Sequence, residues 1–238
     1  MVKAYIFEQM KKMRNYFIAL LLGVLLLTSC KTEQKTTPVT PEKERTVLEK
    51  VAYAHGFAYW DEVAEISFTF NVERDTSHFE RSWTWKPKTN DVTVISSGDT
   101  ATFNRNAIDS TSYQPNGAFV NDKYWLLAPF NLIWDKANFS HEHLPEAVAP
   151  ISQKPMQKLT IVYGSEGGYT PGDAYDFYFE DDFIIKEWVF RRGDQEEPSM
   201  ATTWENYSNQ KGIKIALAHK KKDEAFNLHF TKVAVTLQ

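Results

Sequence analysis

His141 and His143 have the spacing of a metal site. Two histidines two residues apart project from the same side of a strand, where both imidazoles can bind one zinc ion. Asp135 or Glu146 would complete such a site for metal-assisted hydrolysis. Paired histidines in a proline-rich stretch such as residues 137–155 are, however, more often surface side chains. A metal-dependent hydrolase is therefore the weakest alternative, and we expect no metal and no cofactor.

Two further groups of polar residues have the sequence spacing of catalytic or metal-binding motifs. Ser208 and Lys211 have Ser-x-x-Lys spacing, but that chemistry needs the first turn of a helix, whereas these residues precede Gly212 in a predicted hairpin. The adjacent acids 180–182 could bind calcium or act as paired carboxylates, but acids at a strand turn usually face water. We therefore expect a protein without catalytic residues, not an enzyme.

Aromatic side chains give the strongest signal for binding. The chain has 16 Phe, 11 Tyr and 7 Trp, and many recur at every second position, so they share one side of their strands. A concave sheet that carries rings is a natural wall for a hydrophobic cavity, although the same rings could simply fill a core. The predicted wall consists of Phe68, Phe70, Trp83, Trp85, Phe177, Trp188 and Phe190. The predicted cover of the opening consists of Trp125, Phe130 and Trp134.

The elements that must position these rings are mostly strands. From Val63 onward apolar and polar residues alternate, as in a strand with one wet face. Similar strands are predicted at 79–85, 91–96, 159–163, 174–180, 183–191, 201–207, 213–219 and 225–237. A change of apolar phase in the last of them predicts a bulge near Thr231 or Lys232. The pattern indicates a mainly antiparallel α+β domain.

Three segments depart from this alternation. Apolar residues three and four apart predict a helix over residues 41–55, which Gly56 would end. Residues 123–135 are apolar nearly all round, and Pro129 predicts two short turns flanking a kink. Residues 137–155 contain three prolines and are predicted to form a loop lying over the sheet.

The N-terminal residues indicate export. Lys11, Lys12 and Arg14 precede an apolar run over residues 17–27, which is shorter than the about 20 residues that span a membrane. With Cys30 directly after it, this segment resembles a bacterial lipoprotein signal. The resemblance implies that residues 1–29 are removed and that Cys30 is lipidated and anchors the protein.

Composition limits the partners further. Residues 30–44 are rich in Thr and Pro and predict a disordered tether, which leaves residues 45–238 as a single domain. Cys30 is the only cysteine, so no intrachain disulfide can form. The net charge is −4 although the predicted signal is basic, and we therefore expect no nucleic acid partner.

The order of these features resembles the outer-membrane lipoprotein carrier and receptor superfamily, over roughly residues 45–238. The resemblance rests on the segment 125–130 and on a hairpin from 176–179 to 185–188, and it extends to an uncharacterised group of Bacteroidetes lipoproteins. It implies an incomplete, open barrel of about nine to eleven strands with an N-terminal helix and short covering helices. The hollow of that fold receives acyl chains or other lipophilic ligands.

We therefore expect an envelope lipoprotein, anchored in the outer membrane and facing the periplasm, that binds a lipophilic ligand without changing it. One alternative is a protein-interaction subunit of an envelope complex. Such a subunit would use an exposed sheet edge or residues 137–155 for contact.

Overall fold

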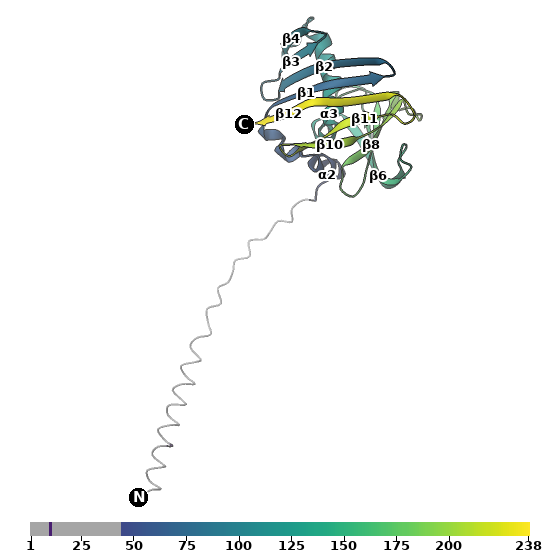
Figure 1. Ribbon diagram of the computed structural model, residues 1–238. Coiled ribbons are helices and arrows are strands. Elements are labelled where there is room, and N and C mark those ends of the chain that lie inside the picture. Colours follow the sequence, from purple (N-terminus) through teal and green to yellow (C-terminus); the bar gives the residue numbers. More distant parts are fainter. Residues whose placement is uncertain (1–9, 11–43) are drawn as a thin grey trace. The chain divides into compact units, whose positions relative to one another are not determined.

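The computed structural model describes residue 10 and residues 44–238, and Arg45–Gln238 form one compact unit (Figure 1). The predicted signal peptide, Cys30 and most of the tether lie outside the described residues, so these remain predictions. Among the helices of the described part, none combines the length and the hydropathy needed to cross a membrane.

The first described helix, α2 (Val47–Ala54), ends before Gly56 as predicted but begins later than the predicted residue 41, because residues 44–46 are not helical. Thr46 is its N-cap, and the Thr46 and Glu49 side chains form a reciprocal capping box. Gly56 follows the helix with φ 95°, a conformation that favours glycine, and its missing side chain lets the chain pass close to Gly212. A 3-10 helix, η1 (Phe57–Glu62), then leads into the first strand.

Seven strands form the larger antiparallel sheet, in the order β10-β11-β12-β1-β2-β3-β4. Its first half in sequence is β1 (Val63–Arg74), β2 (Ser77–Lys86), β3 (Asp91–Ser96) and β4 (Asp99–Asn104). Its second half is β10 (Glu205–Gln210), β11 (Ile213–Lys220) and β12 (Phe226–Leu237). The long strands β1 and β12 pair side by side at its centre (Figure 1).

Five strands form the smaller sheet, in the order β5-β6-β7-β8-β9. They are β5 (Phe139–Val148), β6 (Pro155–Tyr163), β7 (Ala174–Phe179), β8 (Ile185–Arg191) and β9 (Met200–Thr203). The strand predicted over 201–207 is divided at Trp204: β9 pairs with β8, and β10 pairs with β11. One chain segment thus passes from one sheet to the other, and neither sheet closes on itself within the described residues. The prediction of a mainly antiparallel, open β architecture with few helices is confirmed.

The second long helix, α3 (Tyr113–Trp134), packs against both sheets. Its Phe119 ring lies 5.3 Å from the ring of Trp83 on β2, and its Trp125 ring lies 4.6 Å from that of Trp188 on β8. The kink predicted from Pro129 is present: two helical stretches meet at Leu127, whose φ of −130° is not helical. The first stretch begins at Tyr113, before the segment predicted over residues 123–135, so the helical part is longer than the two short turns expected.

Residues 137–155 are not the predicted loop, because most of them form β5 and the turn into β6. The prolines are accommodated in ways that a strand permits. Pro145 lies at a register shift in the edge strand β5, Pro150 lies in the turn, and Pro155 is the first residue of β6. The bulge predicted in the last strand is confirmed, since Lys232 has φ 52° and the β1–β12 register shifts beside it.

Candidate functional site

An apolar cavity of about 320 Å³ lies between α3 and the two sheets. Its wall is mainly aromatic, with a minority of polar side chains, which is the composition expected of a site for a lipophilic ligand. Residues from β1, β12, β7, β8 and α3 contribute Phe70, Val72, Tyr124, Trp125, Tyr175, Trp188, Phe190, Phe226 and Leu228. Arg74, Asn121, Tyr169, Thr170 and Met200 complete the lining.

Four of the ten residues that sequence analysis assigns to a ligand site line this cavity: Phe70, Trp125, Trp188 and Phe190. Phe70 comes from β1, Trp125 from α3, and the other two from β8. Trp125 therefore lies in the wall, between the sheets, where its ring also contacts that of His219 at 5.3 Å. Period-two alternation identified Phe70, Trp188 and Phe190, but the assigned set left out other strand residues of the lining, which are Val72, Tyr175, Phe226 and Leu228.

The other six assigned residues pack elsewhere in the same core. Trp85, Phe130 and Trp134 surround Trp60 of η1, with ring centroids 5.0 to 5.5 Å from it. Trp83 packs on Phe119, and Phe68 on Phe230. Phe177 is fully buried on β7. At these six positions the rings pack on one another and fill the core, which is the alternative to a ligand site given in the sequence analysis.

Two polar groups are buried in the cavity wall. The Tyr124 hydroxyl and the Trp188 indole N–H have no hydrogen-bond partner among the described residues. Burial, aided by Tyr163, Tyr175 and Tyr169 nearby, raises the pKa of Tyr124 well above 10, so its hydroxyl stays neutral. These two groups therefore add no charge to the cavity wall.

Tyr169 is a wall residue that sequence reasoning missed. Its ring stacks on the ring of Tyr124, with centroids 3.8 Å apart and planes 4° from parallel. It lies in a glycine-rich connection between β6 and β7, in which Gly167 and Gly168 have positive φ. Neither alternation nor helical spacing marks a residue in such a loop, so no sequence signal could have found it.

A buried ion pair fixes α3 on β2 next to the cavity. The carboxylate of Asp122 is fully buried and accepts hydrogen bonds from Arg81 Nη2 at 2.8 Å and from Trp83 Nε1 at 2.8 Å. Arg81 Nε also donates to it. Tyr124 and Trp125 follow Asp122 by two and three residues on α3. The ion pair therefore also positions this part of the cavity wall.

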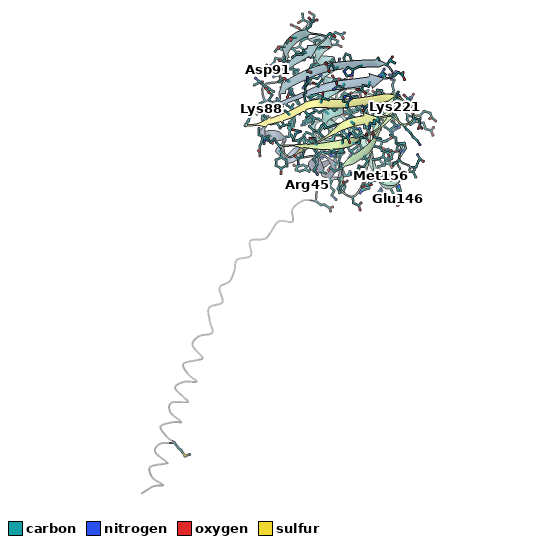
Figure 2. The ribbon with its side chains drawn as sticks, in the orientation of Figure 1. Arg45, Lys88, Asp91, Glu146, Met156 and Lys221 are labelled. Atoms are coloured by element: carbon teal, nitrogen blue, oxygen red, sulfur yellow. The ribbon has the colours of Figure 1, made fainter. Side chains whose placement is uncertain are left out.

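The mouth of the cavity lies at one end of the larger sheet. Arg74 and Phe226 line both the cavity and an adjoining groove that includes Lys221. Figure 2 shows Lys221 at the end of the molecule opposite Lys88 and Asp91, which flank the β2–β3 turn. The guanidinium of Arg74 lies 5.4 Å from the centre of the Phe226 ring. A positive charge thus lies at the apolar opening.

Two buried histidines make the stability of this region depend on pH. Burial lowers the pKa of His55 to about 4 and that of His219 to about 3, although the Thr203 carbonyl partly offsets the effect on His219. His55 joins the end of α2 to the larger sheet, because its Nδ1 donates to the Val51 carbonyl of α2 at 2.8 Å and its Nε2 lies 3.3 Å from the Tyr207 hydroxyl on β10. His219 lies against Trp204, with ring centroids 4.5 Å apart.

We expect acid to destabilise the fold through both histidines. Below the ordinary pKa of 6.5 the unfolded chain binds protons that the folded chain excludes, so the stability present above pH 6.5 is lost as pH falls. The loss at pH 4.5 is roughly 2–3 kcal/mol for each histidine. Urea unfolding of the His219→Phe variant should show about half of this pH-dependent loss. An unchanged pH dependence in that variant would contradict the assignment.

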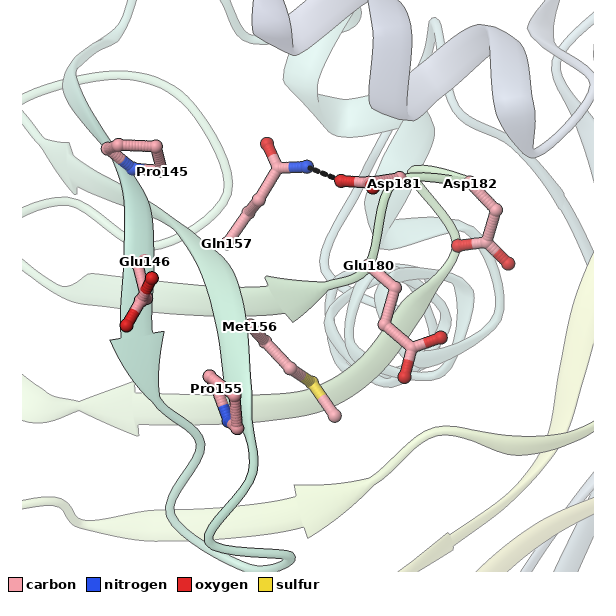
Figure 3. Close-up of a pocket in the computed structure, with 8 residues that line it drawn as sticks. All are labelled: Pro145, Glu146, Pro155, Met156, Gln157, Glu180, Asp181 and Asp182. Atoms are coloured by element: carbon pink, nitrogen blue, oxygen red, sulfur yellow. Dashed lines mark hydrogen bonds between the residues drawn. The ribbon is translucent and has the colours of Figure 1, made fainter.

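The acids 180–182 border a groove of about 530 Å³ on the smaller sheet (Figure 3). The groove lies between β5, the start of β6 and the turn that joins β7 to β8. Asp182 accepts from Lys186 Nζ at 3.1 Å and from the Ile184 backbone N–H at 2.9 Å, and Asp181 accepts from Gln157. Figure 3 shows the carboxylates of Glu146 and Asp182 on opposite sides of the groove. These acids therefore shape a strand turn.

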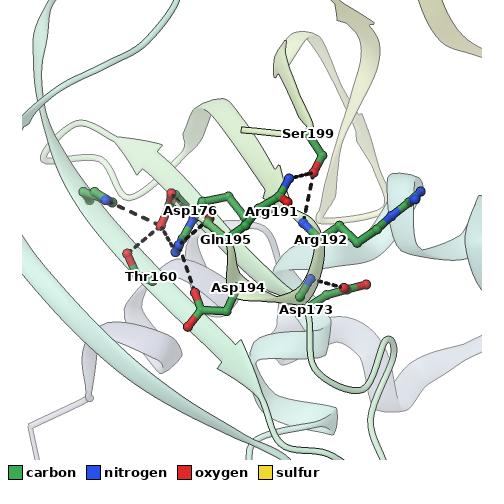
Figure 4. Close-up of polar contacts among 10 residues, drawn as sticks. Thr160, Asp173, Asp176, Arg191, Arg192, Asp194, Gln195 and Ser199 are labelled. Atoms are coloured by element: carbon green, nitrogen blue, oxygen red, sulfur yellow. Dashed lines mark hydrogen bonds and ion pairs between the residues drawn. The ribbon is translucent and has the colours of Figure 1, made fainter. Parts of the chain in front are cut away.

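A second charged cluster lies on β6, β7 and β8, away from the cavity (Figure 4). Asp176 accepts from Thr160 Oγ1 at 2.6 Å and from Arg191 Nε at 3.2 Å, and Lys158 Nζ lies 3.6 Å away. Arg191 also pairs with the exposed Asp194. Each charge has a partner of opposite sign, which is the arrangement of a structural network.

His141 and His143 lie on the edge strand β5, where both are exposed. His143 Nε2 lies 3.0 Å from Gln157 Oε1. In residue 10 and residues 44–238, no group of three or more His, Cys, Asp or Glu side chains is arranged to hold a metal ion. The metal-dependent hydrolase remains a prediction without a supporting observation.

Comparison with solved structures finds weak similarities, of which two are described here. One is to a DUF1329 family protein from Desulfovibrio piger, with a TM-score of 0.46 and 8% identity over 79% of this chain and 91% of that chain. The other is to MucB in complex with MucA(peri), with a TM-score of 0.24 and 10% identity over 80% of this chain and 54% of that chain. No protein-family model and no curated protein matches the sequence. At these values the likenesses carry no conclusion about function.

Proposed function

We propose that this protein is a lipid-anchored envelope protein that binds one lipophilic molecule in the aromatic cavity, without catalysis. The observation that carries the proposal is the cavity itself, about 320 Å³ of space walled by Phe70, Trp125, Trp188 and Phe190. Its volume lies at the small end of the range of about 300–1,000 Å³ for ligand pockets. A single chain or a compact apolar molecule therefore fits better than a ligand with several chains.

The energetics of such binding are favourable. Each methylene group that leaves water for an apolar wall contributes about 0.8 kcal/mol. An acyl chain of ordinary length can thus be held by burial alone. Arg74, at the mouth, is the one charged residue among the described residues that line the cavity.

Native mass spectrometry after gentle extraction tests this function. We expect a co-purified lipid, and we expect the emptied protein to take up a fluorescent fatty acid. The full-length Cys30→Ser chain is the better material for uptake, because it carries no acyl chain of its own. Repeated ligand-free spectra together with no uptake would refute the proposal.

The anchor is tested separately. Replacing Cys30 by serine removes the thiol that lipidation requires, so the protein should move completely from the membrane fraction to the soluble fraction. The matched control is Ser29→Ala, which changes the neighbouring residue and leaves the thiol in place. Unchanged fractionation of the Cys30→Ser chain would show that the membrane attachment has another cause.

A further inference from the structure

A second hollow lies directly against the aromatic cavity. Its volume is about 650 Å³, and β2, the first turns of α3 and the loop that carries Tyr169 form its wall. Asn121, Tyr169 and Thr170 line both spaces. These three side chains are therefore the divider between an inner cavity and an outer hollow.

The divider is held by ring contacts and side-chain hydrogen bonds, one of them from Asn121 Nδ2 to Asp122 Oδ1 at 3.0 Å. Tyr169 stacks on Tyr124, and its hydroxyl donates one long hydrogen bond, 3.5 Å, to Asn121 Oδ1. Thr170 Oγ1 lies 2.6 Å from the hydroxyl of Tyr175. A shift of the Tyr169 ring would join the two spaces without breaking a strand.

The two linings differ in chemistry. The inner cavity is walled mainly by aromatic and aliphatic side chains, whereas Gln114 and Asn116 give the outer hollow two amides of its own. Asn116 Oδ1 already accepts from Arg105 Nε at 3.2 Å, so its Nδ2 can donate to a ligand, and the Gln114 amide can both donate and accept. Arg81 is the one charged residue among the described residues that line the outer hollow, and its charge is paired with Asp122. The outer hollow therefore suits a polar group without net charge.

We infer that the two spaces form one site for an amphiphile, with its chain in the inner cavity and an uncharged, hydroxyl-rich headgroup such as a sugar in the outer hollow. The inference rests on the proposed function, since it needs the chain to occupy the inner cavity. It adds the chemical class of the headgroup and a second binding surface on α3.

Gly117 offers a clean way to block the outer hollow. It lines that space, it has no positive φ, and a Cβ built on it would meet nothing within 4 Å. Gly117→Trp should fill the outer hollow without disturbing the core. Gly117→Ala is the matched control, since it makes the same backbone change and leaves the space open.

The test compares two probes with the same chain length, dodecyl maltoside and dodecanoic acid, each below its micelle concentration, titrated into full-length Cys30→Ser protein. We expect Gly117→Trp to weaken dodecyl maltoside about tenfold, as loss of one or two hydrogen bonds would, and to leave dodecanoic acid within about twofold. Gly117→Ala should change neither affinity, and Val72→Phe in the inner cavity should weaken both.

Failure of the headgroup site and failure of the proposed function give different results. If Val72→Phe weakens both probes while Gly117→Trp changes neither, or weakens both equally, the headgroup site is wrong and the proposed function stands. If no probe binds, or Val72→Phe has no effect, the inner cavity is not the chain site, and both the proposed function and this inference are overturned.

Discussion

Replacement of Asp122 by alanine is expected to cost about 3–5 kcal/mol of unfolding free energy, because it leaves a charge without its buried partner. The carboxylate is fully buried, and Arg81 and Trp83 both donate to it. In the variant, the guanidinium of Arg81 and the indole N–H of Trp83 keep their positions but lose their acceptor. A loss of this size is a large share of the total stability of a domain.

Asp194→Ala is the matched control for this prediction. Asp194 also pairs with an arginine, at 2.9 Å from Arg191 Nη1, but its side chain is 44% exposed. Water can replace that contact, so the expected cost is below about 1 kcal/mol. Urea unfolding of both variants gives the comparison, and equal small losses would show that the Asp122 pair does not hold α3 on the sheet.

The second large effect is expected at Val72, which lines the cavity from β1. A phenylalanine side chain there would occupy space that the ligand chain needs. Excluding as few as two methylene groups forfeits about 1.6 kcal/mol, so the Val72→Phe variant should bind a fluorescent fatty acid at least about tenfold more weakly. Direct titration with unfolding controls measures the effect.

Val148→Phe is the same substitution on the surface. Val148 lies on the edge strand β5 and is 63% exposed, outside the cavity. Its affinity for the fatty acid should equal that of the unchanged protein. Should both variants bind equally well, the ligand lies somewhere other than the aromatic cavity.

Much of the fold could be predicted from residue alternation, because a strand with one wet face leaves a direct trace in the sequence. That rule located β1 and also the bulge beside Lys232. It failed for β5, where prolines dominate the local pattern. An edge strand tolerates them at a register shift and at its ends, and position in the sheet cannot be read from a single segment.

The helix α3 shows a different limit. Its central residues are apolar on every side because both sheets cover them, so no amphipathic stripe marks its extent. Pro129 correctly predicted a kink between two helical stretches, yet the first stretch begins at Tyr113, well before the apolar segment. Local propensity could not reveal that tertiary packing holds the two halves together.

For the site, sequence reasoning could identify the ring-bearing face but not the empty part of it. Phe70 and Trp85 obey the same alternation on neighbouring strands, yet Phe70 faces the cavity while Trp85 packs on Trp60. Trp60 comes from η1, whose path across the core has no signature in the sequence. Whether a ring meets space or another ring depends on such distant segments.

The most direct test of the central claim is anomalous diffraction from crystals of the full-length Cys30→Ser chain grown with dodecanoic acid that carries bromine on its terminal carbon. If the ligand chain occupies the aromatic cavity, we expect a bromine peak inside it, among Phe70, Trp125 and Trp188. A peak only on the outer surface, a peak in the packed cluster around Trp60, or no ordered bromine at all would contradict it.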